Sequence, residues 1–452
     1  MIDESLIGWA FLLAMLCWRA LTTLPGVQRR LHYCPFVAPL LQWYTLSILG
    51  LACLLLDLVL NDFIRYRGLT SDRIAQNIET VCESEGLSAE ACSRLKADLR
   101  IPEWLRVAAV SSPIFGVCAF VALTLVLARF IRYNHRKKVR GGLPTPWSLA
   151  RRLEWGVIIL GMPLVFIVSA MRALLRILAV MTGSAWKPGV SWDAQERTEI
   201  ATYSMDLELG LAFQFYGILM FGLLCTSFLE HSRYISTHDA TEGQHYMRTL
   251  AYAAIQGVYA FVIVGVLRSV FDVVVTFLLE QPTHRTAAED LQTTVLGSVG
   301  IIFTFVTLLC MVNMAIISRV KDMKDNLGNA NIKFLGTRLL LLIAQIQPQA
   351  LALVAEDSTT FHVTEKPLIA KFGLQVRVRF FVEGLAFSAH QAMLLHVSLL
   401  NIEGLIVALL TAYAWRLDSA QRAALMELEA ERSARLALAR DASLEHQRLP
   451  AV

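Results

Sequence analysis

The stretch EWGVIILGMPLVFIVSAMRALLRILAV, residues 154–180, decides the fold class of this chain. Its charged residues are Glu154 at the start and Arg172 and Arg176 toward the end, and everything between them is apolar or small. About 20 consecutive, mostly apolar residues are enough for a helix to cross the hydrocarbon core of a bilayer. The stretch therefore predicts a transmembrane helix.

The composition of the whole chain agrees with this prediction. Of its 452 residues 56% are hydrophobic and 17% are charged, and the mean hydropathy is +0.52. An ordinary soluble domain has about 25% charged residues. A membrane protein needs the apolar excess because its lipid-facing and its core-facing positions must both be apolar. The net charge of +4 is too small to favour a nucleic-acid partner.

Eight further stretches are long and apolar enough to span a bilayer. We therefore expect an all-α, polytopic membrane bundle of about nine transmembrane helices. A shorter apolar stretch, Ile402 to Trp415, either continues the last span or lies along the membrane surface. The nine expected spans are residues 5–24, 38–60, 107–130, 154–180, 207–229, 249–279, 292–318, 334–355 and 375–400.

Basic residues predict the orientation of these spans. The connection at residues 131–153 holds seven Lys and Arg, and short loops rich in Lys and Arg stay in the cytoplasm. If the spans alternate, the N-terminus is outside or lumenal and the C-terminus is cytoplasmic. The connection at residues 61–106 then lies outside, although it also carries basic residues, because it is long and rich in acids.

This long connection, residues 61–106, reads as a helical hairpin. Gly86 suits the end of a first helix and Ser88 the N-cap of a second. Cys82 and Cys92 flank the turn, close enough for a disulfide. A disulfide here requires an oxidising exterior or lumen, in agreement with the expected orientation.

After Trp415 the chain becomes polar and helical in composition, to about Arg448. Leucines recur there at helical spacing among Glu and Arg. One interpretation is a solvated amphipathic helix in the cytoplasm. The other is a helix that binds a partner or the membrane surface.

Several expected spans contain ionisable or amide side chains, which are costly in lipid and mark either pathways or pairs between helices. Arg268 and Asp272, four residues apart, are expected to pair with each other. We hypothesise that Glu208, Arg338, Gln347, Glu383 and His390 line one polar cavity between the spans 207–229, 334–355 and 375–400. It would be a track across the membrane and not a compact cluster, because Glu208 and Arg338 lie near opposite ends of their spans. The alternative is that they form separate structural pairs. All residues considered for a solute pathway are Arg172, Arg176, Glu208, Gln214, Arg338, Gln347, Glu383 and His390.

No catalytic or metal-binding motif accompanies these residues. The chain has no HExxH, GxSxG or Walker pattern, and its eight cysteines form no CxxC pair. We therefore expect neither an enzyme nor a bound cofactor or metal. Arg172, Arg176 and Arg338 are instead candidates to hold the anionic head of an amphipathic solute.

Three short motifs resemble the organic solute transporter alpha and transmembrane protein 184 family. KFLGTRLLLLIAQIQ, residues 333–347, matches the sixth span of that family with Lys333, Phe334, Arg338 and Gln347. ELGLAFQF, residues 208–215, is similar to the start of its third span, and VEGLAFSAHQ, residues 382–391, to its last span. The sequence departs from the family pattern in having Ile346 in place of an aromatic residue and Gln391 in place of a second histidine.

The resemblance implies a seven-span core at residues 107–400 with an outside N-terminus. Residues 1–106 would then add two spans and the hairpin, and residues 401–452 an interfacial and cytoplasmic helical tail. It also implies facilitated transport of amphipathic organic solutes such as steroid conjugates. The expected partners are the lipid bilayer, a small organic solute, and a single-span accessory subunit or a second copy. Other members of that family look like endomembrane proteins with trafficking roles. The alternative function is therefore an endomembrane scaffold or trafficking adaptor that acts through the tail.

Overall fold

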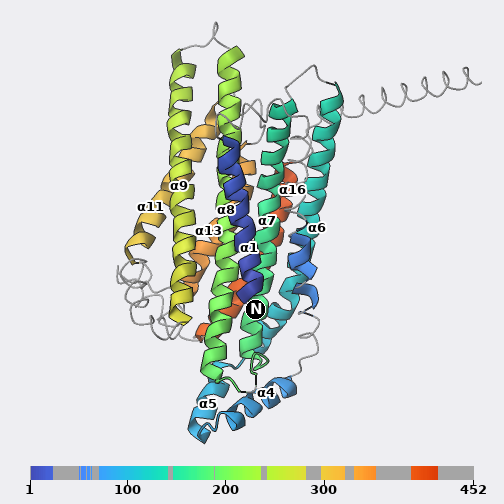
Figure 1. The fold of residues 1–452 in the computed structure, drawn as a ribbon, viewed down its shortest axis with the longest axis vertical. Coiled ribbons are helices and arrows are strands. Elements are labelled where there is room, and N and C mark those ends of the chain that lie inside the picture. Colours follow the sequence, from blue (N-terminus) through green and yellow to red (C-terminus); the bar gives the residue numbers. More distant parts are fainter. Residues whose placement is uncertain are drawn as a thin grey trace, which may run out of the picture.

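The computed structural model describes residues 2–23, most of 50–63, 71–140, 146–235 apart from 188, 242–280, 297–320, 330–352 and 388–415. Their regular structure is helical throughout, with no strand among them, as the sequence predicts. Figure 1 shows the long helices side by side along the longest axis of the molecule, with the short α4 and α5 at one end. The helices are α1 (Ile2–Thr23), α4 (Ser71–Ser84), α5 (Ala89–Asp98), α6 (Glu103–Arg140), α7 (Pro146–Met181), α8 (Trp192–Ile235), α9 (Glu242–Glu280), α11 (Gly297–Arg319), α13 (Ala330–Ala352) and α16 (Ala389–Ala414).

Helix α7, formed by the stretch that decided the fold class, is the centre of the bundle. Its most apolar 18-residue segment is 100% buried inside the protein, against 33% for the corresponding segments of α6 and α9. A helix that is apolar on every face needs protein or lipid on every face. Neighbouring helices cover every face of the apolar part of α7. Helices α6 and α9, in contrast, have large apolar side chains exposed on the protein surface, among them Ile114, Leu125, Ile263 and Leu267. A lipid environment accounts for such surfaces.

Five described helical segments are long and apolar enough to cross a membrane. They are Glu103–Ile131, Trp155–Met181, Trp192–Ser227, His245–Leu278 and Ala389–Ala414. Shorter apolar segments lie at Gly8–Trp18, Ala52–Asn61 and Phe305–Arg319. The chain is thus compatible with a multi-pass membrane protein, while the expected number of nine spans stays a prediction. The expected tail helix, residues 416–448, lies outside the described residues.

The last described helix begins later than the sequence suggested. Ser388 caps α16: its side chain accepts a hydrogen bond from the backbone of Gln391, and the Gln391 side chain accepts one from the backbone of Ser388. From this capping box α16 runs without interruption through the stretch 402–415, which therefore continues the preceding helix. The domain boundary expected at 400/401 falls inside it. Hydrophobicity alone did not locate this start, because the apolar character begins well before the cap.

The expected hairpin and its disulfide are present. Helices α4 and α5 are joined through Gly86, whose φ of 61° is a left-handed conformation that favours glycine. Ser88 is the N-cap of α5, accepting a hydrogen bond from the backbone of Ala91. Cys82 and Cys92 form a disulfide with their Cα atoms 5.6 Å apart.

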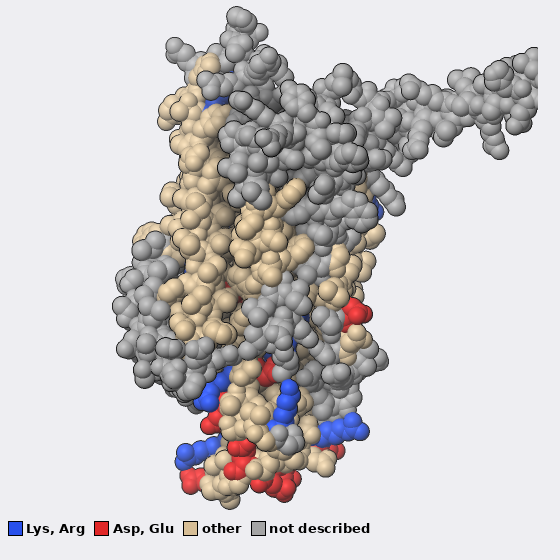
Figure 2. Space-filling model, in the orientation of Figure 1, with Lys and Arg blue, Asp and Glu red and all other residues tan. Residues whose placement is uncertain are grey.

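The hairpin is attached to the end of the bundle by hydrogen bonds to three elements. Asn77 Nδ2 donates to the carbonyl of Thr182 after α7, and the backbone N–H of Trp192, at the start of α8, donates to Glu85. Gln391 Nε2, in the first turn of α16, donates to the carbonyl of Arg100. In Figure 2 the charged side chains of the visible face gather mainly at this end, and the described surface beyond it is mostly uncharged.

Replacing both Cys82 and Cys92 by serine is expected to destabilise the hairpin by about 2–3 kcal/mol, since the bridge closes a short loop in the unfolded chain. Hydrogen exchange should show faster amide exchange in α4 and α5. The middle of α7 should be unaffected, because only its last turn, with Val180, packs against the hairpin. Unchanged exchange in the hairpin would mean that its docking contacts alone hold it.

Candidate functional site

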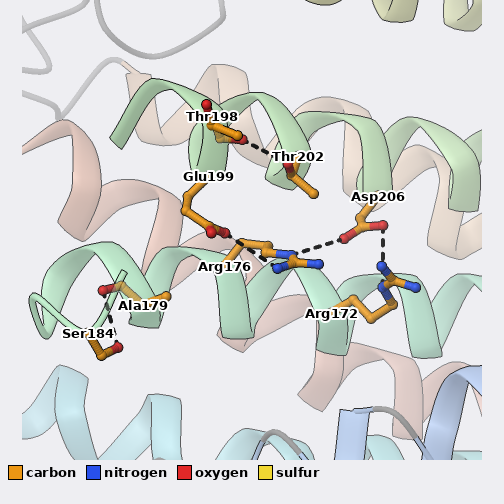
Figure 3. Close-up of polar contacts among 8 residues, drawn as sticks. All are labelled: Arg172, Arg176, Ala179, Ser184, Thr198, Glu199, Thr202 and Asp206. Carbon is orange, nitrogen blue, oxygen red and sulfur yellow. Dashed lines mark hydrogen bonds and ion pairs between the residues drawn. The ribbon is translucent and has the colours of Figure 1, made fainter. Parts of the chain in front are cut away.

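A cluster of buried ion pairs joins α7 to α8. Arg172 Nε lies 3.4 Å from Asp206 Oδ1, and Arg176 Nε lies 3.9 Å from Asp206 Oδ2. Arg176 Nη1 is also 3.5 Å from Glu199 Oε2. Figure 3 shows Arg176 pointing between the two acids, with Arg172 on the far side of Asp206. The Asp206 side chain is 1% exposed and that of Arg172 is 6% exposed, so this cluster is shielded from the surroundings.

The spacing of these residues explains why they meet. Arg172 and Arg176 are four residues apart and therefore lie on one face of α7. Glu199 and Asp206 are seven residues apart, two turns, and share the facing side of α8. Gly210 permits close helix contact beyond them, because a Cβ atom there would lie only 3.0 Å from Phe166 Cδ2 and 3.2 Å from Ser169 Cβ of α7. Ion pairing and glycine packing thus hold the same interface.

A third acid on α8 extends the cluster toward the hairpin. Glu196 Oε1 lies 2.9 Å from Nε2 of His390, in the first turn of α16. Together the residues Arg172, Arg176, Glu196, Glu199, Asp206 and His390 form what we call the α7–α8–α16 seam. It lies toward the hairpin end of the bundle, since α7 ends and α16 begins there. Two arginines and a histidine thus face three acids in the seam.

A second polar group joins α13 to α16. His396 Nδ1 is 2.8 Å from Gln347 Oε1, and Gln347 Nε2 is 3.4 Å from both carboxylate oxygens of Glu403. His396 and Glu403 are seven residues apart and so share one face of α16. They lie about 9 and 20 Å further along α16 than His390, at 1.5 Å per residue. Polar groups are therefore placed at several depths of the bundle.

A third group joins α8 to α9. The Glu208 carboxylate lies near the Ser269 side chain and Arg268 of α9. Arg268 Nε is 3.6 Å from Asp272 Oδ2, so the expected pair of residues four apart is present. The Arg268 guanidinium also lies over the ring of Phe303, 4.9 Å from its centroid. This face of α8 differs from the one that carries the seam.

Arg338 has different surroundings. Its side chain is in α13, its residue is 1% exposed, and Nη2 donates to the carbonyl of Thr307 in α11 at 2.8 Å. The guanidinium carbon lies 4.7 Å from the ring centroid of Phe261 and 5.7 Å from that of Phe334. Among the described residues it has no carboxylate partner within salt-bridge distance. Gln214 is also buried, and its Nε2 has no hydrogen-bond partner within the described part of the chain.

The structure therefore does not bring the expected pathway residues into one cavity. Glu208 faces α9, Arg338 faces α9 and α11, Gln347 faces α16, and His390 faces α8. Glu383 lies outside the described residues. Arg172 and Arg176 do come together, on acids that the hypothesis did not include. Polar side chains from different helices do contact one another, because an unpaired charge in lipid is costly. They do so in separate helix interfaces and not in one shared cavity.

Five members of these groups were missed in the sequence. Three are Glu196, Glu199 and Asp206, which precede the apolar run that was expected to begin at 207. The other two, His396 and Glu403, lie near or beyond the expected end of the last span. Their helical spacing was a usable signal, because acids at positions i and i+3 or residues at i and i+7 share a face. Among the residues that the structure describes, no group of three or more His, Cys, Asp and Glu is arranged to hold a metal.

These features define an all-helical protein with membrane-length helices and ionisable side chains buried between them. No family model, curated protein or solved structure matches the chain. The resemblance to the organic solute transporter family accordingly rests on its three motifs alone.

Proposed function

We propose that this protein is a carrier that moves amphipathic organic solutes, of the anion or steroid-conjugate type, across a membrane by facilitated transport. The observation that supports it most is the α7–α8–α16 seam, in which Arg176 lies between Glu199 and Asp206. Ionisable side chains between membrane-spanning helices are costly and mark pathways by default. An arginine within reach of two acids can exchange one for the other while helices shift, as alternating access requires.

The proposed topology has nine spans: a core of α6, α7, α8, α9, α11, α13 and α16, and two N-terminal spans. Contacts of the hairpin support the alternation, because α6 follows α5 directly, Thr182, the residue after α7, lies beside Asn77, and α16 begins beside Asp98. The hairpin end is proposed as the outside or lumenal end, where a disulfide is stable. The basic connection 131–153 then lies at the opposite, cytoplasmic end.

The proposal extends to a relationship with the organic solute transporter alpha and transmembrane protein 184 family, which the three motifs resemble. In that case a single-span accessory subunit or a second copy completes the working unit. The uncovered apolar faces of α6 and α9 offer such a helix a place in the membrane, in competition with lipid.

Uptake by proteoliposomes tests the transport proposal. Vesicles containing the purified protein are expected to accumulate a radiolabelled steroid sulfate faster than protein-free vesicles. Asp206→Asn should slow uptake at least about tenfold, since it removes a charged partner of both arginines. Glu90→Gln, in an exposed ion pair with Arg94 on α5, is the matched control and should leave uptake unchanged.

Equal uptake by protein-containing and protein-free vesicles, with an accessory single-span subunit also supplied, would remove the carrier proposal. The scaffold alternative would then lead, with the tail from Arg416 onward as the part that binds a partner. Loss of binding partners on removal of residues 416–452, with the bundle still folded, would be its signature.

A further inference from the structure

The charge on Arg338 has no counterpart among the described residues. The three other arginines placed above between membrane-length helices each lie beside an acid: Arg172 and Arg176 beside Asp206, and Arg268 beside Asp272. Among the described residues, Arg338 instead has one hydrogen bond to an oxygen, from Nη2 to the carbonyl of Thr307, and its Nε and Nη1 have no oxygen or nitrogen acceptor. The Cys310 side chain is also adjacent, and a thiol is a weak acceptor.

Ring contacts do not compensate for this charge. A cation over a phenyl ring gains much less than the cost of transferring an isolated ion out of water. The same place holds another unsatisfied group, because the buried Thr307 hydroxyl has no hydrogen-bond partner in the part of the chain that the structure describes. Two guanidinium nitrogens and one hydroxyl are thus buried together at the junction of α9, α11 and α13.

Aromatic rings connect Arg338 to the ion pair of Arg268 and Asp272 on α9. Phe261, which lies against Arg338, is stacked on Phe303 with ring centroids 5.7 Å apart and an interplanar angle of 23°. Phe303 in turn lies against Arg268, whose charge Asp272 balances. The arrangement has a cation at each end of an apolar aromatic surface, and only the Arg338 end lacks an anion.

We propose that Arg338 binds the negatively charged head of an amphipathic ligand, a sulfonate, sulfate, carboxylate or phosphate group, with Thr307 as an additional hydrogen-bonding group. A guanidinium suits such oxyanions because it donates several hydrogen bonds in one plane. Phe261 and Phe334 provide apolar contact for the adjoining part of the ligand. As the head-group subsite of the carrier, this inference rests on the proposed function, but the binding itself can be measured without transport.

Binding of matched amphiphiles to the full chain in phosphatidylcholine nanodiscs tests the site. Octanesulfonate and octyltrimethylammonium have the same apolar tail and permanent charges of opposite sign. Wild type is expected to bind octanesulfonate, and to bind octyltrimethylammonium much more weakly. Arg338→Met should reduce octanesulfonate affinity at least about tenfold, the usual worth of a hydrogen bond to a charged group. Arg338→Lys should retain part of the affinity, and Arg94→Gln on the exposed hairpin should retain all of it.

The thermal midpoint separates this role from a structural one. Arg338→Met removes a buried, unbalanced charge and keeps an apolar chain of similar length, so the ligand-free variant should unfold at an equal or higher temperature than wild type. Octanesulfonate should raise the midpoint of wild type and not that of the variant. A variant that unfolds at a markedly lower temperature and still binds octanesulfonate would show that Arg338 only supports the backbone at Thr307.

Two arms distinguish the source of the anionic head. If phosphatidylglycerol added to the nanodiscs competes with octanesulfonate in wild type, the head group can come from a lipid; without competition it comes from a dissolved solute. Either result keeps the site. No octanesulfonate binding together with no phosphatidylglycerol retained in native mass spectrometry would overturn it. Binding that persists while steroid sulfate uptake is absent would leave the site in place and remove the carrier proposal alone.

Discussion

Replacing Asp206 by alanine is expected to lower the free energy of unfolding by about 3–5 kcal/mol, the cost of breaking a buried ion pair by removing one partner. Both Arg172 and Arg176 would lose a carboxylate that is 1% exposed, in an interface that water does not reach easily. Arg176 would retain its pair with Glu199. Denaturant unfolding in mixed micelles, followed by tryptophan fluorescence, measures the change.

A matched replacement separates a lost pair from a general loss of packing. The double variant Arg172→Met, Asp206→Leu removes both charges and keeps apolar volume, so it should recover much of the stability lost in Asp206→Ala. Glu90→Ala, in an exposed pair, should have no measurable effect. If Asp206→Ala unfolds like wild type, the α7–α8 ion pairs do not stabilise the bundle.

Gly265→Ala is expected to destabilise the contact between α8 and α9 by about 1–3 kcal/mol, the usual cost of overpacking a core. A Cβ atom at Gly265 would collide with the ring of Phe215. That ring cannot move aside easily, because it packs edge-on against Phe261 and Phe303. The same unfolding measurement detects the loss.

The compensating change Phe215→Leu should restore part of the stability in the double variant, because a smaller side chain makes room for the new methyl group. Gly50→Ala is the control, since a Cβ there meets nothing within 4 Å. It should be neutral or slightly stabilising, as alanine favours helix more than glycine does. Additive losses in Gly265→Ala and Phe215→Leu would contradict the proposed collision.

The sequence predicted the features that depend on local chemistry. The length and apolarity of residues 154–180 indicated a membrane-length helix, and α7 is one. Gly86, Ser88 and the two cysteines predicted the hairpin, because caps, turns and a bridge over ten residues are decided nearby in the chain. Arg268 and Asp272 were expected to pair for the same reason.

The sequence did not predict which helices face one another. Glu208 and Arg338 were expected at different depths of one polar track, yet Glu208 faces α9, and Arg338 lies against Phe261 and Thr307. Periodicity indicates which residues share a face of one helix, but it does not say which neighbour covers that face. The partners Glu199 and Glu403 were missed because apolar runs define the hydrophobic middle of a helix and not its ends.

Counterflow in proteoliposomes tests the proposal of a carrier most directly. Vesicles preloaded with unlabelled steroid sulfate should take up the labelled compound several times faster than empty vesicles, because a carrier returns more readily when loaded. Asp206→Asn should abolish this stimulation, and Glu90→Gln should preserve it. Wild-type uptake that is the same with and without preloading, or no greater than that of protein-free vesicles, would contradict the account.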